Sequence, residues 1–290
     1  MAMLIIARLT LREASRRRLI LAVFILTAIL AVLTGWAFHR LLQLKCNSAG
    51  GVPTACSAAE LRIIAATLLI LLAFMFSFVL AVGAAFIGAP TIATDIESGV
   101  LLAVLPRPIR RSDVVLGKWL GLATLITAYA GLACGIEFVI AKISFGYVPP
   151  HPIIAILFLV AEALVVLALT LAASTKMPAM TCGIVVVVLF GLTWMSGIAG
   201  AVGAAFHSRA IQNVGTVGSL IFPTDGLWRA AIYNLEPVAV LAAGSAASRE
   251  ASGNPFFVNS GPSAAYLLWV LGWGIVVLSI ALWSFTRREL

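Results

Sequence analysis

Six apolar stretches, each long enough to cross a membrane as a helix, dominate this sequence of 290 residues. A helix needs about 20 mostly apolar residues to span the hydrocarbon core of a bilayer. The stretches are Leu19–Phe38, Ile63–Ala89, Val114–Ile140, Ile153–Ala173, Cys182–Phe206 and Ala264–Phe285. Hydrophobic residues make up 62% of the chain and charged residues 10%, which excludes an ordinary water-soluble globule. The sequence therefore predicts an all-α polytopic membrane protein, with residues 1–290 forming a single transmembrane domain.

The distribution of basic residues predicts the orientation of this domain. With both termini in the cytoplasm, 12 of the 19 Lys and Arg residues fall inside and 7 fall outside. Cytoplasmic loops of membrane proteins carry such an excess of basic residues. We therefore expect a multi-pass protein of the inner (plasma) membrane with cytoplasmic N and C termini. The net charge of +8 then reflects contact with the lipid bilayer, and nucleic acid is not expected as a partner.

Two segments outside the apolar stretches have a recognisable character. In residues 1–18, Arg8, Arg12 and Arg16 recur every four residues beside a stripe of small and apolar residues, which predicts an amphipathic helix at the membrane surface. Residues 207–263 fall on the extracytoplasmic side and are interrupted by Pro223 and Pro237. We expect short helices lying at the outer interface in this segment.

The four cysteines suggest no metal centre. Cys134 and Cys182 lie within apolar stretches and are expected to be buried thiols. Cys46 and Cys56 share a polar outer loop, where they either form a disulfide or stay free, and the sequence leaves both alternatives open. Neither a zinc-binding H-E-x-x-H nor a catalytic G-x-S-x-G motif occurs, so no metal ligand and no catalytic residue is predicted.

The loop at residues 94–113, between the second and third stretches, is the most informative part of the chain. Thr94 and Glu97 have the spacing of a capping box, which predicts that a short helix begins there. Pro106 and Pro108 would end that helix, giving a helix over residues 94–105. A basic cluster of Arg107, Arg110 and Arg111 follows it. A rigid element at this place either transmits force to a cytoplasmic partner or simply connects two spans.

The sequence from Glu97 to Lys118 resembles the signature of ABC-2-type ABC transporter permeases. That signature has an acidic residue, a glycine, an apolar stretch, a proline, an Arg-rich turn and Gly-Lys. The matching positions here are Glu97, Gly99, Leu101 to Leu105, Pro106, Arg110, Arg111, Gly117 and Lys118. Val100 follows Gly99 where the family often has Thr, a mild departure. The basic leader resembles the elbow helix of this family, and F-P-T-D-G-L-W-R at residues 222–229 resembles an outer motif of NosY-like permeases.

The resemblance implies the transmembrane subunit of an ABC transporter that works as an exporter. Two permease copies, most simply a homodimer, would form the substrate pathway. Two separate ABC ATPase subunits would bind at residues 94–105, which would act as a coupling helix. The residues implied in coupling are Thr94, Asp95, Glu97, Gly99, Pro106, Arg107, Arg110, Arg111 and Lys118. Residues 207–263 would gate the pathway or dock an extracytoplasmic accessory protein.

The sequence agrees with this division of labour because it has no phosphate-binding G-x-x-x-x-G-K-[ST] loop. We therefore expect that this chain is not an enzyme and binds no cofactor, and that the partner subunit holds ATP and Mg²⁺. Two acidic residues, Glu137 and Glu162, lie within predicted spans, where charged groups are costly and often functional. Both are candidates for the substrate pathway. Alternatives are an ion-gradient-driven transporter that uses Glu162, and a membrane assembly factor.

Overall fold

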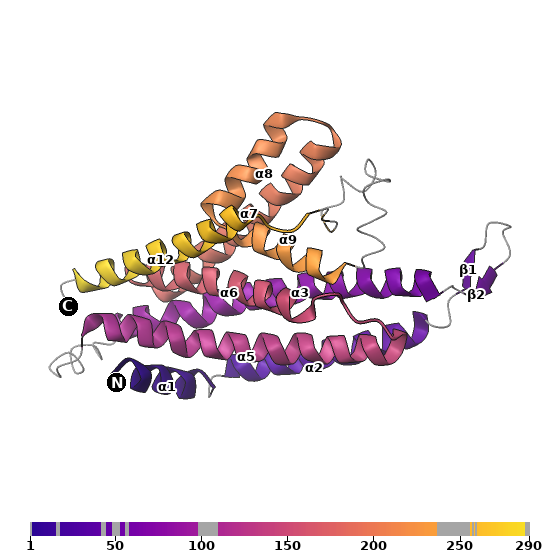
Figure 1. Cartoon of the computed structure of the whole chain (residues 1–290). Coiled ribbons are helices and arrows are strands. Elements are labelled where there is room, and N and C mark those ends of the chain that lie inside the picture. The colour runs from indigo at the N-terminus through magenta and orange to yellow at the C-terminus, as the bar shows by residue number, and fades with distance from the viewer. Residues whose placement is uncertain are drawn as a thin grey trace.

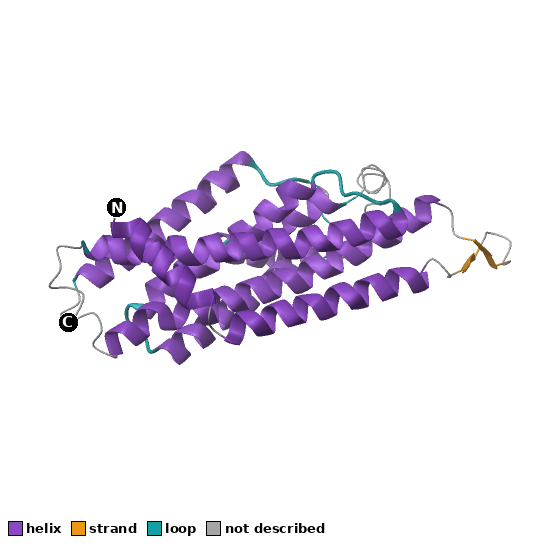
Figure 2. Cartoon of the chain, turned by 90° about the horizontal axis from the view of Figure 1, so that it is seen from below, coloured by secondary structure: helices purple, strands orange, loops and turns teal. Residues whose placement is uncertain are grey.

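The computed structural model describes residues 2–15, 18–41, 45–47, 53–55, 58–97, 110–236, 256, 258 and 260–287. The described chain is an elongated bundle in which most helices run along one direction (Figures 1 and 2). The helices are α1 Ala2–Ser15, α2 Arg18–Leu41, α3 Ala58–Glu97, α5 Arg111–Phe145, α6 Pro152–Ser174, α7 Ala179–Ala205, α8 Arg209–Ile221, α9 Thr224–Leu235 and α12 Ala264–Thr286. The predicted all-α fold is confirmed, with a small addition. Strands β1 Lys45–Asn47 and β2 Pro53–Ala55 pair as an antiparallel hairpin at one end of the bundle.

Each of the six predicted apolar stretches forms a helix. Five helices, α3, α5, α6, α7 and α12, are long and apolar enough to cross a membrane. The described apolar part of α2, Phe24–Arg40, is shorter than a full span. Local sequence explains two helix boundaries. Helix α6 begins at Pro152, because proline is favoured in the first turn of a helix, and α5 ends at Gly146, which adopts a left-handed conformation.

The core of the bundle lies among α3, α5, α6 and α9. Helix α6 is the most enclosed span, and its side chains pack on α3, α5, α9 and α12. Helices α8 and α9 confirm the short helices predicted for residues 207–263. Helix α9, however, does not lie at a surface: nearly all of it is buried, including Leu227, Trp228 and Ile232, against α3 and α6. Its apolar side chains complete the core rather than facing an interface.

Helices α7 and α8 form a tight antiparallel hairpin (Figure 1). Glycines allow the two backbones to meet. A methyl group added at Gly203 would lie 2.7 Å from the backbone nitrogen of Gln212, and one added at Gly215 would lie 2.8 Å from the Cα atom of Gly200. Gly200 and Gly203 thus serve the close packing of α7 on α8, while Gly197 leaves room for the Asp225 side chain of α9.

The N-terminal helix α1 packs along the first half of α5, again through glycines. A methyl group added at Gly117 would lie 2.8 Å from the carbonyl oxygen of Met3, and one at Gly121 would lie 2.6 Å from that of Ala7. The predicted N-terminal helix is therefore confirmed, and α5 fixes its position. Gly117, which the signature motif contains, is explained by this approach of α1 rather than by any phosphate cradle.

Candidate functional site

The two ends of the 94–113 loop are joined by an ion pair between α3 and α5. The Lys118 ammonium group contacts the Asp95 carboxylate and also donates a hydrogen bond to the backbone carbonyl of Thr91. The Lys118 side chain is 11% exposed and that of Asp95 32%. A charged group this enclosed needs a partner, and the Thr91 carbonyl and the Asp95 carboxylate supply it.

A second contact ties the start of α5 to the end of α12. The Arg111 guanidinium donates hydrogen bonds to the backbone carbonyls of Thr286, at 3.1 Å, and Phe285, at 3.5 Å. Carbonyls at a helix C terminus lack partners within the helix and carry partial negative charge, so a cation stabilises them. We call the four residues Thr91, Asp95, Arg111 and Lys118 the loop base. They connect α3, α5 and α12 on both sides of the loop.

The structure thus pairs two of the predicted coupling residues, Asp95 and Lys118, while a third, Arg111, contacts the end of α12 instead. Arg110 is exposed and precedes the first residue of α5. Glu97 is the last residue of α3. Gly99, Pro106 and Arg107 lie outside the described residues, as does most of the predicted 94–105 helix.

The prediction that a helix begins at Thr94 is wrong. Thr94 lies near the end of the 40-residue helix α3, which continues through Pro90 to Glu97. Helix α5 already begins at Arg111, so the non-helical part of the predicted loop is shorter than 94–113. A capping-box spacing has no capping role where a preceding helix continues through it and supplies the hydrogen-bond acceptors.

The two acidic residues within the spans are both buried. Glu162 of α6 is buried, and its Oε1 atom accepts a hydrogen bond of 2.9 Å from the hydroxyl of Ser77 in α3. Glu137 of α5 is also buried. Neither residue lines the main cavity described below. Their assignment to a substrate pathway stays a prediction.

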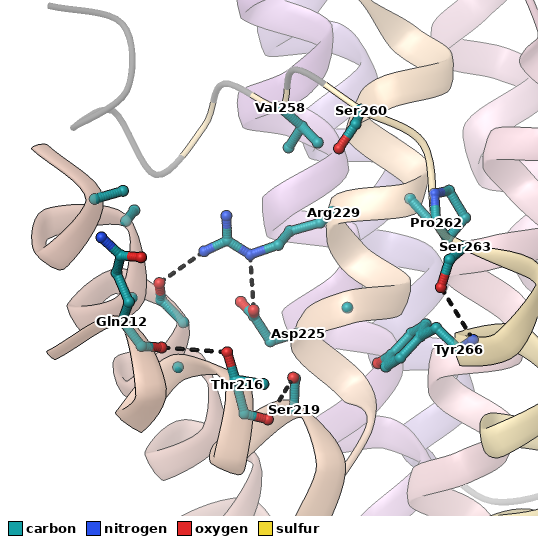
Figure 3. Close-up of a pocket in the computed structure, with 17 residues that line it drawn as sticks. Gln212, Thr216, Ser219, Asp225, Arg229, Val258, Ser260, Pro262, Ser263 and Tyr266 are labelled. Carbon is teal, nitrogen blue, oxygen red and sulfur yellow. Dashed lines mark hydrogen bonds and ion pairs between the residues drawn. The ribbon is translucent and has the colours of Figure 1, made fainter. Parts of the chain in front are cut away.

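A polar cavity of about 580 Å³ lies between α7, α8, α9 and the start of α12 (Figure 3). Its charged centre is an ion pair within α9: Arg229 Nε donates to Asp225 Oδ2 at 2.7 Å. Arg229 Nη2 donates to the Gly197 carbonyl of α7, also at 2.7 Å. Asp225 and Arg229 are not among the residues predicted for coupling or for the pathway, although their spacing of four is that of a helical ion pair.

An aromatic row on α12 holds the junction of α8 and α9 beside this cavity. Tyr266, Trp269 and Trp273 donate hydrogen bonds to the backbone carbonyls of Pro223, Leu220 and Ile221, at 3.2, 3.1 and 2.9 Å. One face of a helix therefore satisfies three carbonyls that the helix end and the turn leave without partners. Because these carbonyls lie at the junction of α8 and α9, the three hydrogen bonds hold both helices against α12.

Glu236, just after α9, is buried and anchors the chain that leads to α12. Its Oε1 atom accepts a hydrogen bond of 3.1 Å from the backbone N–H of Val258. Burial raises the pKa of the Glu236 carboxyl from 4.5 to about 7, although the Val258 hydrogen bond opposes this shift. Burial, and after it the charge of the Glu236 carboxylate, raise the pKa of the nearby Tyr147 hydroxyl, which donates to the Leu235 carbonyl at 2.7 Å.

We expect this carboxyl to make the stability of the protein depend on pH. The pKa of the Glu236 carboxyl is higher in the folded state than in the unfolded state, so protonation of this carboxyl favours folding. This stabilisation of the folded state is complete below about pH 4.5 and is lost as the pH rises through about 7. The unfolding temperature, followed by circular dichroism in detergent, should therefore fall by a few degrees between pH 5 and pH 8. Glu236→Gln should reduce this fall, and an unchanged pH profile in that variant would contradict the assignment.

Metal and disulfide chemistry receive no support here. Over the described ranges, no group of three or more His, Cys, Asp or Glu side chains could hold a metal ion. The β1–β2 register places Cys46 opposite Thr54, but Cys56 lies outside the described residues. A Cys46–Cys56 disulfide therefore stays a prediction. Cys134 and Cys182 are buried free thiols, as predicted.

The described part of the chain has five helices long and apolar enough to cross a membrane, an ion-paired loop base at one end and a polar cavity among α7, α8, α9 and α12. No curated protein matches the chain. The family model described as ABC-2 family transporter protein matches residues 4–290, nearly the whole length. The resemblance suggested by the signature motif is confirmed: this multi-pass membrane protein belongs to the ABC-2 family of ABC transporter transmembrane subunits.

Proposed function

We propose that the chain is the membrane subunit of an ABC exporter that works as a homodimer. Two separate ATPase subunits would bind ATP and Mg²⁺, and this chain would hydrolyse none. Family membership supports the partnership with ABC ATPases. The excess of basic residues on one side supports an inner-membrane orientation with both termini in the cytoplasm. An accessory protein would dock on the extracytoplasmic segment 207–263.

The observation that carries the coupling proposal is the loop base. Lys118 and Asp95 join the two ends of the loop, and Arg111 extends the connection to α12. Helix α1 is packed onto the same part of α5 through Gly117 and Gly121. A force applied to the loop would therefore act on α1, α3, α5 and α12 together.

The mechanism is a shift between two conformations of the dimer. ATP binding would bring the two ATPase subunits together, and the loops resting on them would move with them. Because nucleotide binds the two conformations with different affinity, it supplies the energy for the shift. The loop base would pass this movement into the spans, and the two copies would rock relative to each other to open the pathway.

The test is co-purification of the full-length chain from its native host with a C-terminal tag in mild detergent. Mass spectrometry would identify the bound chains, and ATP hydrolysis would be measured on the same sample. We expect an ATPase with a phosphate-binding loop in near-equal amount. Glu97→Lys, which reverses the charge at the loop end of α3, should reduce the bound ATPase at least fivefold.

The matched control is Glu60→Lys, the same change in the first turn of the same helix at its opposite end. This variant should retain the bound ATPase. Equal loss in both variants would indicate a general folding defect and contradict a role for Glu97 in coupling. A wild-type chain that purifies without any ATPase, and transports with an ion gradient alone, would overturn the proposal in favour of a carrier that uses Glu162.

A further inference from the structure

The polar cavity among α7, α8, α9 and α12 is built around one oriented cation. Asp225 is buried, 6% exposed, while the Arg229 side chain is 27% exposed. Both side chains line the cavity, and the guanidinium is the more exposed of the two, so the positive charge is the one that a ligand reaches more easily. Burial raises the pKa of the Asp225 carboxyl, and the adjacent guanidinium opposes this and favours the ionised form.

Of the three guanidinium nitrogens of Arg229, the terminal nitrogen Nη1 is available to donate to a ligand. Nε donates to Asp225, and Nη2 donates to the Gly197 carbonyl. Within the described part of the chain, Nη1 makes no hydrogen bond. Figure 3 shows the Arg229 side chain projecting from α9 into the space between α8 and the Ser260–Ser263 segment. Two fixed hydrogen bonds lower the entropy that the side chain loses when a ligand binds.

The remaining walls combine polar side chains with a smooth apolar surface. Hydroxyl groups come from Thr216 and Ser219 of α8 and from Ser260, Ser263 and Tyr266 near α12. The α7 wall consists of small residues, including Gly200, Ala201 and Ala204. Thr216, Ser219 and Tyr266 already donate their hydroxyl protons to backbone carbonyls, so their oxygens face the cavity as acceptors. The Ser263 hydroxyl accepts a hydrogen bond from the Tyr266 N–H and keeps its own proton to donate to an oxygen of a ligand. The volume of about 580 Å³ is in the range typical of small-molecule sites.

We propose that this cavity binds a ligand bearing an anionic oxygen group, a phosphate or a carboxylate, which accepts a hydrogen bond from Arg229 Nη1. The hydroxyl-lined walls hold the polar body of the ligand. Two sources supply this chemistry, the headgroup of an anionic lipid and a free phosphate ester. The inference concerns binding to this chain and does not rest on the proposed coupling to an ATPase.

The test measures binding to the purified full-length chain without any ATPase. Dioleoylphosphatidic acid is titrated and its adducts are counted by native mass spectrometry, with dioleoylphosphatidylcholine as the zwitterionic comparison. Glycerol 3-phosphate is titrated separately by calorimetry. The main variant is Asp225→Asn combined with Arg229→Gln, which removes both charges and leaves none unpaired. A charge-assisted hydrogen bond is lost, so we expect about tenfold weaker binding of the anionic probe.

Two further variants make the result interpretable. Arg209→Gln removes the same charge from an exposed position at the start of α8 and should leave binding unchanged. Ser260→Trp places a large side chain at the cavity while keeping both charges of the ion pair, and should also weaken binding about tenfold. Unfolding temperatures close to the wild-type value show that each variant is folded. If the double variant does not fold, Ser260→Trp decides the test.

If phosphatidic acid shows the expected dependence on the cavity variants, the site takes a lipid headgroup. If only glycerol 3-phosphate binds, and the cavity variants weaken its binding, the site takes a soluble phosphate ester. The proposal is overturned if the anionic probes do not bind the wild-type protein, or if they bind the wild type and the cavity variants equally. Equal weakening by Arg209→Gln overturns it too, because the attraction would then be a general surface effect.

Discussion

Gly203→Val is expected to lower the unfolding temperature of the protein by about 6 °C, since overpacking a contact this tight costs about 3 kcal/mol. The Cβ atom of the new side chain would lie 2.7 Å from the backbone nitrogen of Gln212 and 2.9 Å from the backbone carbon of Ile211. Backbone atoms cannot swing aside as a side chain can. Helix α8 would therefore have to separate from α7, which would also open the wall of the polar cavity.

The measurement uses the buried free thiols of Cys134 and Cys182. A thiol-reactive dye labels them only as the protein unfolds, once accessible thiols have been blocked. Gly191→Val is the control on the same helix, because a Cβ atom at Gly191 meets nothing within 4 Å. It should change stability by no more than about 0.5 kcal/mol. Equal destabilisation by both variants would mean that valine in α7, and not contact with α8, is responsible.

The sequence predicted the spans well because the apolar stretches themselves decide which segments are helical in a membrane. Two helices, α3 and α5, are longer than the apolar stretches that predicted them. The stretch Ile63–Ala89 lies within α3, Ala58–Glu97, because hydropathy marks the apolar part of a helix and not its polar continuation. Pro90 removes one backbone donor, yet neighbouring helices stabilise the chain on both sides of it.

The site was predicted less completely, for a different reason. Asp95 and Lys118 were both singled out, but the sequence does not reveal that they pair, because the contact depends on how α3 and α5 pack. For Asp225 and Arg229 the spacing was visible. The burial of α9 was not, since a 12-residue segment with a charged pair has the composition of a surface helix. The packing of Leu227, Trp228 and Ile232 against α3 and α6 buries α9 in the structure, and the Asp225–Arg229 pair on the same helix lines the cavity.

Lys118→Met is expected to destabilise the protein by about 2–3 kcal/mol. Methionine keeps most of the apolar stem, so the lost interactions are those of the ammonium group with the Asp95 carboxylate and the Thr91 carbonyl. The partly buried Asp95 would then carry a charge without its partner, which is the larger part of the expected cost. Lys142→Met, at an exposed position in the last turn of the same helix, should have an effect below about 0.5 kcal/mol.

A double-mutant cycle with Asp95→Asn separates the ion pair from other effects of the substitution. If the two side chains interact as the loop base requires, the double variant should be at least about 1 kcal/mol more stable than the sum of the single effects predicts. Strict additivity would contradict the pair. ATP hydrolysis by the native complex adds a second readout. Because Lys118 joins the ends of the loop without being part of it, Lys118→Met should retain the bound ATPase while weakening the response of its activity to substrate.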